Sequence, residues 1–153
     1  DGVQQVILNG ENVTSLLRTE ETGKMASKTS KYAAVRTKLV ALQRGLAKKT
    51  DVIMDGRDIG TTVLPDAFAK IYLTASSDAR AKRRYDELKE KGENRSFDAI
   101  KEDIEKRDYE DMHRAISPLK QADDAVLVDT SDMNIEQVVA VLSKIIDEKK
   151  AGR

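Results

Sequence analysis

The 153-residue sequence contains no cysteine, no tryptophan, two prolines and a single histidine. Without cysteine, the chain forms no disulfide bond and no thiolate metal site, and one histidine excludes a zinc site built from several histidines. Aromatic residues make up only 4% of the chain, so a stacking surface for single-stranded nucleic acid is not expected. The sequence also lacks the run of about 20 apolar residues that spans a membrane, and its first residues do not read as a signal peptide. We therefore expect a soluble cytoplasmic protein without a membrane partner.

No charge of either sign is in surplus, although 35% of the residues are charged. There are 27 basic and 27 acidic side chains, so the formal net charge is zero. Proteins that bind nucleic acid usually carry a basic surplus, and the balance here argues against such a partner while leaving room for local arginine clusters. The length suits one domain with a hydrophobic core.

What the chain does have is an alternation of short apolar runs with charged helical segments. This pattern is typical of buried parallel strands in an α/β fold. The predicted strands are residues 3–8, 11–14, 52–54, 70–73 and 125–128. The predicted helices are residues 19–49 with a break near 28–31, 76–91, 96–114 and 134–148. Asn9-Gly10 predicts a hairpin turn between the first two strands.

Two of these helices carry apolar residues at helical spacing, which predicts core-facing stripes. In the first helix the stripe is Val35, Leu39, Leu42 and Leu46. In the last helix it is Ile135, Val138, Val139, Leu142, Ile145 and Ile146.

The segment Asp55-Gly56-Arg57-Asp58 follows the predicted strand 52–54. Ligands of open α/β sheets bind beyond the carboxyl ends of the strands, where this segment falls. Arg57 offers a planar fork of donors for a phosphate, Asp58 an acceptor for an exocyclic amine, and Asp55 a carboxylate that reaches a hydrated magnesium ion. The alternative is a charged loop with an internal ion pair, and the spacing alone leaves both readings open.

The predicted helix 96–114 changes character along one face. Phe97, Ile100 and Ile104 form an apolar stripe, and the next positions on that face are Arg107, Asp111 and Arg114. Two arginines around an aspartate suit a sugar phosphate, with guanidinium groups on the phosphate and the carboxylate on ribose hydroxyls. The alternative is a helix that runs past the core into water, with ion pairs between successive turns.

A third cluster is basic, and it comprises Arg80, Lys82, Arg83 and Arg84. The default interpretation is a solvated helix face. The alternative is a mobile lid whose arginines close over transferring phosphates. His113 is predicted to lie on the surface, and Ser117-Pro118 predicts a helix stop.

The motifs DGRDIGT (55–61) and VLPDA (63–67) resemble those of the bacterial cytidylate kinase family. The resemblance extends to VILNGENVT (6–14) with the following LLRTEE, to ASSDARAKRR (75–84) and to EKRDYEDMHRAISPLKQADDAVLVDT (105–130). It therefore covers nearly the whole chain. The resemblance implies a nucleoside-monophosphate kinase fold of pyrimidine metabolism, with a parallel sheet, flanking helices and a helical lid. It also implies transfer of the γ-phosphoryl group of ATP to CMP or dCMP with Mg²⁺.

The same resemblance implies roles for individual residues. Ser27, Arg36 and Asp58 match positions that recognise cytosine, Arg107 and Asp111 the ribose-side pair, and Arg57 and Arg114 the ligands of the CMP phosphate. Arg57, Arg107 and Arg114 are the expected catalytic groups, and Arg83 and Arg84 the lid residues at ATP. Catalysis would rest on alignment and charge neutralisation, without a dedicated general base.

One family feature is absent from the sequence. A phosphate-binding loop reads G-x-x-x-x-G-K-[ST], but the only Gly-Lys pair here, Gly23-Lys24, is followed by Met25. In this fold the strand before that loop lies between the strand ending at Asp55 and the strand ending near Thr74. We therefore expect 1–153 to be a partial kinase domain, with residues 3–30 as the CMP-binding insert and 76–114 as the lid region. Its sheet would re-pair, or a dimer would cover the exposed edges.

The sequence is compatible with three functions. The first is ATP-dependent CMP phosphorylation by a monomeric parent protein, with this chain inactive by itself. The second is a non-catalytic CMP-binding fragment, and the third is a helical interaction module that binds no nucleotide. The sequence does not rank CMP, dCMP and UMP as substrates.

Overall fold

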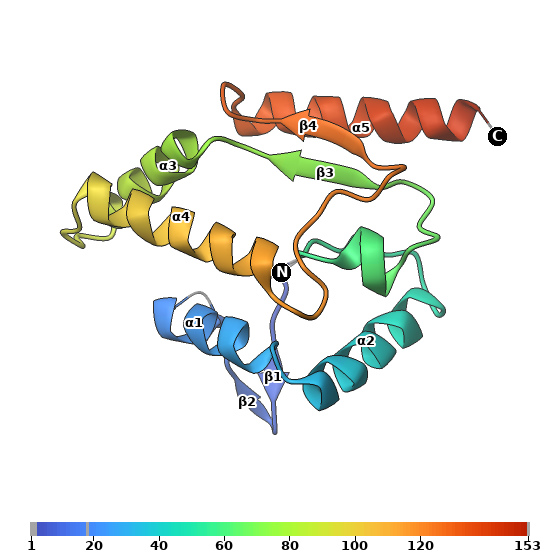
Figure 1. The fold of residues 1–153 in the computed structure, drawn as a ribbon, viewed down its shortest axis with the longest axis horizontal. Coiled ribbons are helices and arrows are strands. Elements are labelled where there is room, and N and C mark those ends of the chain that lie inside the picture. The colour runs from blue at the N-terminus through green and yellow to red at the C-terminus, as the bar shows by residue number, and fades with distance from the viewer. Residues whose placement is uncertain (1–2, 18, 153) are drawn as a thin grey trace. The chain divides into compact units, whose positions relative to one another are not determined.

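The computed structural model describes residues 3–17 and 19–152, and it divides the chain into two compact units (Figure 1). The first unit is Asp1–Asp51 and the second is Val52–Arg153.

The first unit opens with a short hairpin. Strands β1 (Ile7–Leu8) and β2 (Glu11–Asn12) pair antiparallel. Asn9 and Gly10 both have positive φ angles, 52° and 88°, as a type I′ hairpin turn requires. The predicted hairpin is confirmed, but its strands are shorter than predicted. Next to the strands, Val13 N donates to the Val6 carbonyl at 2.9 Å, and Thr14 Oγ1 accepts from Val6 N at 2.9 Å and donates to Asn12 Oδ1 at 2.7 Å. The chain then enters a 3₁₀ turn, η1 (Thr14–Leu16).

Two helices complete the first unit, α1 (Glu20–Thr29) and α2 (Ala33–Ala47). The predicted break between them is confirmed. The predicted core-facing stripe on α2 is wrong, because Val35, Leu39, Leu42 and Leu46 are 37%, 49%, 58% and 52% exposed. Among residues 3–17, 19 and 21–51, none is buried. The physical reason is that a hairpin with two-residue strands and two short helices present too little apolar surface to cover one another.

The second unit has a parallel pair of strands with flanking helices, as the α/β prediction required. Strand β3 (Ile71–Thr74) pairs with β4 (Val126–Asp129) in a parallel register that matches Ile71 with Val126 and Thr74 with Asp129. The helices are α3 (Ser77–Glu90), α4 (Phe97–His113) and α5 (Ile135–Ala151). Ser76, Ser96 and Asn134 cap them, each with a side chain that accepts from a backbone N–H of the first turn.

The predicted strand at residues 52–54 is wrong. These residues pair with no strand among the described residues, and Ile53 is 98% exposed. A strand needs a neighbour for its backbone groups, and an apolar run by itself does not supply one. In the described residues β3 likewise pairs only with β4.

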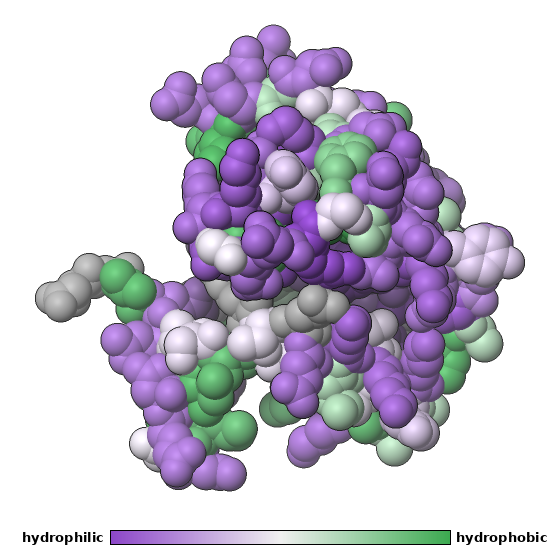
Figure 2. Space-filling model, turned by 90° about the vertical axis from the view of Figure 1, so that its left-hand side faces the viewer, coloured by the Kyte–Doolittle hydropathy of each residue, from purple (hydrophilic) through white to green (hydrophobic). Residues whose placement is uncertain are grey.

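The core of the second unit lies between α3 and α4, which run side by side (Figure 1). Ala81, Leu88 and Ile100 are at most 2% exposed and pack against Tyr85, Phe97 and Ile104. The rings of Tyr85 and Phe97 meet edge to face, with centroids 6.5 Å apart. On α5 the predicted stripe is half-buried at best, because Ile135 is 83% and Val139 56% exposed. Hydrophilic side chains dominate the molecular face in Figure 2, as the charge content suggests.

Leu88→Ala is expected to destabilise the second unit by about 3 kcal/mol, because truncating a buried leucine loses transfer free energy and leaves a cavity. Leu127→Ala is the matched control, since the Leu127 residue is 56% exposed and its truncation should cost less than about 1 kcal/mol. Urea unfolding followed by circular dichroism measures both. Equal losses in the two variants would contradict the core assignment.

No described helix combines the length and the apolar character that a membrane span needs.

Candidate functional site

Arg57 and Asp58 immediately precede a π-helical turn. Asp58 precedes η2 (Ile59–Val63), a π-helical turn in which the Asp58 carbonyl accepts from Thr62 N at 2.8 Å and Val63 N at 3.2 Å. The turn leaves Asp58 only 9% exposed. π-Helical turns occur frequently at functional sites, and sequence periodicity did not predict this one.

Lys70 packs against this π-helical turn. Its side chain is 9% exposed, its Nζ donates to the Pro65 carbonyl, and the same Nζ lies 2.6 Å from an Asp124 carboxylate oxygen. Its aliphatic stem leaves little space beside Gly60, where an added Cβ would stand 3.2 Å from Lys70 Cδ. The Lys70 hydrogen bond lowers the pKa of the Asp124 carboxyl. Lys70 therefore joins the turn to the start of β3, and no pattern in the sequence predicts this role.

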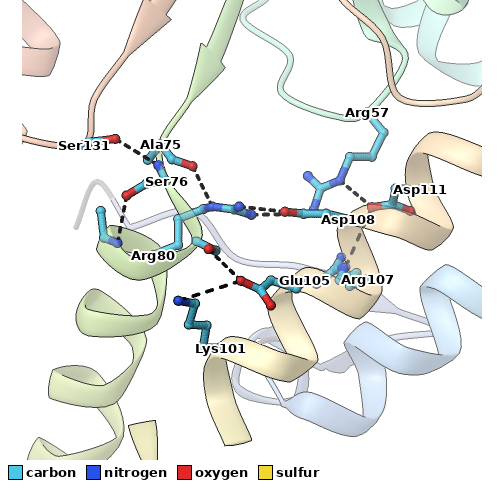
Figure 3. Close-up of polar contacts among 12 residues, drawn as sticks. Arg57, Ala75, Ser76, Arg80, Lys101, Glu105, Arg107, Asp108, Asp111 and Ser131 are labelled. Atoms are coloured by element: carbon cyan, nitrogen blue, oxygen red, sulfur yellow. Dashed lines mark hydrogen bonds and ion pairs between the residues drawn. The ribbon is translucent and has the colours of Figure 1, made fainter. Parts of the chain in front are cut away.

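Asp111 lies at the centre of the site, in the last turn of α4. It is 6% exposed and its Oδ2 accepts from Arg57 Nε at 2.8 Å (Figure 3). Arg107 Nε approaches the same oxygen at 4.0 Å, and Arg114 Nη1 approaches Oδ1 at 3.9 Å. One buried carboxylate thus gathers three arginines from two segments of the chain.

Arg114 is the least exposed arginine of this group, with a side chain that is 11% exposed. It caps α4 in an extended conformation, so the chain leaves the helix here as Ser117-Pro118 predicted. Its Nε donates to the carbonyl of Ser117, a residue with a positive φ of 49°. Its Nη2 lies 3.8 Å from Asp58 Oδ1, and this buried nitrogen makes no hydrogen bond to any described residue.

The charges of the site favour an anion. Three guanidinium groups face two carboxylates, which leaves a net charge of +1. A buried guanidinium nitrogen without a hydrogen bond is costly, and a ligand oxygen at this place would satisfy it. Guanidinium forks match the geometry of phosphate oxygens. The arrangement can therefore hold a phosphate and offers carboxylate acceptors beside it.

The two segments that the sequence singled out, residues 55–58 and the polar end of the helix 96–114, lie together in this site. Arg57 and Asp58 follow the apolar run 52–54, Arg107 and Asp111 share one face of α4 as the spacing predicted, and Arg114 follows as the cap of that helix. An ion pair internal to the 55–58 loop does not describe Arg57, which bonds to Asp111 instead. The alternative of a helix end that extends into solvent holds for Arg107, whose side chain is 56% exposed. It does not hold for Asp111 or Arg114, whose side chains are 9% and 11% exposed.

Two further predicted residues, Ser27 and Arg36, belong to the first unit. Ser27 lies in α1, is half-buried, and accepts the Ser30 hydroxyl through its carbonyl at 2.8 Å. Arg36 lies in the first turns of α2 and is half-buried. Their roles at cytosine stay predictions.

The basic cluster on α3 divides into two pairs. Lys82 bonds to Asp86 at 2.6 Å and Arg84 to Glu87 at 2.8 Å, which fits the predicted solvated face. Arg80 and Arg83 instead reach other elements, Arg80 to Asp108 on α4 and Arg83 to the Thr130 carbonyl after β4. Lys91 and Arg84 lower the pKa of Glu87 to about 2. The lid role of Arg83 and Arg84 at ATP stays a prediction.

Asp55 is exposed, and the described residues contain no group of three acidic or histidine side chains that could enclose a metal ion. A single carboxylate fits Mg²⁺, which usually keeps several waters and binds through one or two carboxylates and substrate phosphates. His113 lies on the surface as predicted, with its ring stacked on Tyr109 at a centroid distance of 4.0 Å.

Comparison with known proteins gives one consistent family. The cytidylate kinase family model matches residues 2–148. The chain is 52% identical over 150 residues to a cytidylate kinase of Lactobacillus johnsonii, covering 98% of this chain and 65% of the relative. It is 47% identical over 142 residues to one of Thermosipho melanesiensis, covering 93% and 65%. With one of Bacillus licheniformis the identity is 45% over 149 residues, covering 97% and 66%. The chain thus spans less than two thirds of the length of these relatives.

Proposed function

The chain belongs to the cytidylate kinase family, and from this premise we propose that its whole protein transfers the γ-phosphoryl group of ATP to CMP or dCMP. The observation that supports the proposal is the buried Arg114 Nη2, which lacks a hydrogen-bond partner among the described residues beside a site with a surplus of guanidinium groups. Such a site is preorganised for a phosphate, because its donors are already in place before the ligand arrives.

In the proposed complex, the arginines and carboxylates of the second unit bind different parts of the nucleotide. Arg57 and Arg114 bind the CMP phosphate, Asp111 and Arg107 the ribose hydroxyls, and Asp58 the cytosine amino group. Ser27 and Arg36 are the proposed base-recognising residues of the first unit. The choice among CMP, dCMP and UMP depends on these contacts.

The catalytic contribution of the site is electrostatic. Phosphoryl transfer needs an aligned acceptor and neutralised charge more than it needs covalent chemistry. Arg57, Arg107 and Arg114 would neutralise the acceptor phosphate, and Arg83 and Arg84 would meet ATP. Asp55 would hold a hydrated Mg²⁺ through water, and the ion would supply charge neutralisation for the phosphates. The reaction belongs to pyrimidine nucleotide metabolism in the cytoplasm, with a monomeric parent protein.

The 153 residues contain the CMP side of this reaction but no G-x-x-x-x-G-K-[ST] loop for ATP. The second candidate function is therefore a CMP-binding fragment that does not catalyse transfer by itself. The observation that favours it is the assembled arginine site in a chain without that loop.

Isothermal titration calorimetry of this chain tests the proposed CMP site. We expect CMP to bind at least about tenfold more tightly than cytidine, because the phosphate gains charge-assisted hydrogen bonds from the guanidinium groups. AMP serves as the control for general phosphate attraction, and its binding should be weaker than that of CMP. Binding of neither CMP nor dCMP would favour the helical interaction module instead.

A further inference from the structure

The two halves of α4 are held in different ways. Its first half is anchored by apolar side chains, since Phe97, Ile100 and Ile104 pack against α3. In its second half Tyr109 and Met112 are 65% and 48% exposed, and the one buried residue is the polar Asp111, at 6% exposed. Apolar packing therefore does not fix the half of α4 that carries the site.

A bidentate ion pair joins this half to α3. Arg80 Nη1 donates to Asp108 Oδ1 at 3.0 Å and Arg80 Nη2 to Asp108 Oδ2 at 2.6 Å. The two side chains are 36% and 24% exposed. Fork-to-fork pairs of this kind specify geometry as well as contributing energy, because both hydrogen bonds form only in one relative orientation.

Arg80 is itself tied to the end of the sheet. Its Nε donates to the carbonyl of Ala75, the residue after β3, at 3.0 Å (Figure 3). The next residue, Ser76, donates its backbone N–H to Ser131 Oγ in the loop after β4 at 2.9 Å. Through Arg80, Asp108 is thus linked by hydrogen bonds to the carboxyl ends of both strands.

We propose that Arg80 and Asp108 are positioning residues that hold Asp111 and Arg107 of α4 in register with Arg57. Asp108 lies three residues before Asp111, about one helical turn away. A shift of about 1 Å along or around α4 would break the 2.8 Å bond between Arg57 Nε and Asp111 Oδ2, and misplacements of this size cost large factors in ligand binding and rate. The consequence for CMP rests on the proposed function, whereas the register of Asp111 and Arg57 does not.

The competing interpretation is an ordinary surface ion pair, which contributes little. The chain offers a matched control between the same two helices, because Lys101 on α4 bonds to Asp78 on α3 at 2.8 Å. Their side chains are 33% and 65% exposed, and Lys101 belongs to the first half of α4, which the apolar core already anchors.

The experiment compares four variants of the full chain: Arg80→Met, Arg80→Lys, Asp108→Asn and the control Lys101→Met. Two readouts are measured in each, the CMP affinity by calorimetry and the Arg57 Nε–H signal in arginine-side-chain ¹⁵N NMR without ligand, assigned with Arg57→Lys. The NMR signal reports directly on the bond to Asp111 and is independent of CMP. Asp108→Asn is nearly isosteric, so it keeps the test available should Arg80→Met fail to fold.

We expect Arg80→Met and Asp108→Asn to move the Arg57 Nε–H signal and to weaken CMP binding about tenfold. Arg80→Lys should recover part of both effects, since lysine keeps the charge but not the fork. Lys101→Met should leave both readouts unchanged. An unmoved Arg57 signal with unchanged CMP affinity in Asp108→Asn would overturn the proposal. A moved Arg57 signal in a chain that does not bind CMP would support the positioning role and contradict the proposed function instead.

Discussion

Replacing Arg114 with alanine is expected to weaken CMP binding to this chain by about 100-fold, which corresponds to about 2.7 kcal/mol. The side chain is 11% exposed and lies between Asp58 and Asp111. Its loss removes a charged hydrogen-bond donor, so the attraction between the site and the phosphate weakens. It also leaves two carboxylates facing the phosphate with one guanidinium group fewer, so the electrostatic repulsion of the phosphate increases. Calorimetric titration with CMP measures the effect.

Two variants make the Arg114 result specific. Arg114→Lys keeps the positive charge but loses the planar fork, so we expect a smaller loss of affinity than with alanine. Arg95→Ala removes an arginine whose ion pair with Asp103, at 2.6 Å, lies outside the site, and it should leave CMP affinity unchanged within about twofold. An Arg114→Ala chain that folds and binds CMP as tightly as the unaltered chain would remove Arg114 from the site.

The second large effect is an expected absence of turnover. We expect the purified 153-residue chain to form no CDP from ATP and CMP above background. The backbone N–H groups and lysine of a phosphate-binding loop cradle the phosphates of the nucleotide, and no such loop occurs in this sequence. Chromatographic separation of CDP from CMP, with a complete cytidylate kinase as the positive control, measures the rate.

A contaminating kinase would mimic activity, so the variant Arg57→Ala is assayed beside the unaltered chain. CDP formation that persists in Arg57→Ala comes from a contaminant. CDP formation that is present in the unaltered chain and lost in Arg57→Ala would contradict the expectation, and would show that ATP is held without the phosphate-binding loop.

Local rules predicted most of the helices, their ends and the hairpin turn. Asn9-Gly10 adopts the positive φ angles that its turn requires, and Ser76 and Ser96 cap the helices that follow them. These features depend on residues within a few positions of one another, so the sequence determines them directly. The wrong predictions are the strand at 52–54 and the core-facing stripe of α2, and the α5 stripe is less buried than predicted. These segments are apolar, but their pairing and burial depend on partners that local sequence does not reveal.

In the candidate site, too, local sequence predicts some features, and others depend on residues far apart in the chain. Helical spacing placed Arg107 and Asp111 on one face. The strand-end rule singled out Arg57 and Asp58, although the strand at 52–54 to which it was applied does not form. The contacts that hold these residues in place were not predictable. Arg80 and Asp108 lie 28 positions apart, and no periodicity states which carboxylate a given arginine meets. The same holds for Lys70, which precedes β3 and whose ammonium group reaches Asp124 in the turn before β4.

The most direct test of the account is the map of CMP binding on this chain. Backbone ¹⁵N–¹H NMR spectra are recorded during titration with CMP and, separately, with cytidine. We expect that within the second unit CMP perturbs mainly residues 55–63 and 107–119, and that cytidine perturbs them less because it brings no phosphate. CMP perturbations confined to other residues, or absent at saturating concentration, would contradict the claim that these arginines and aspartates form a CMP site.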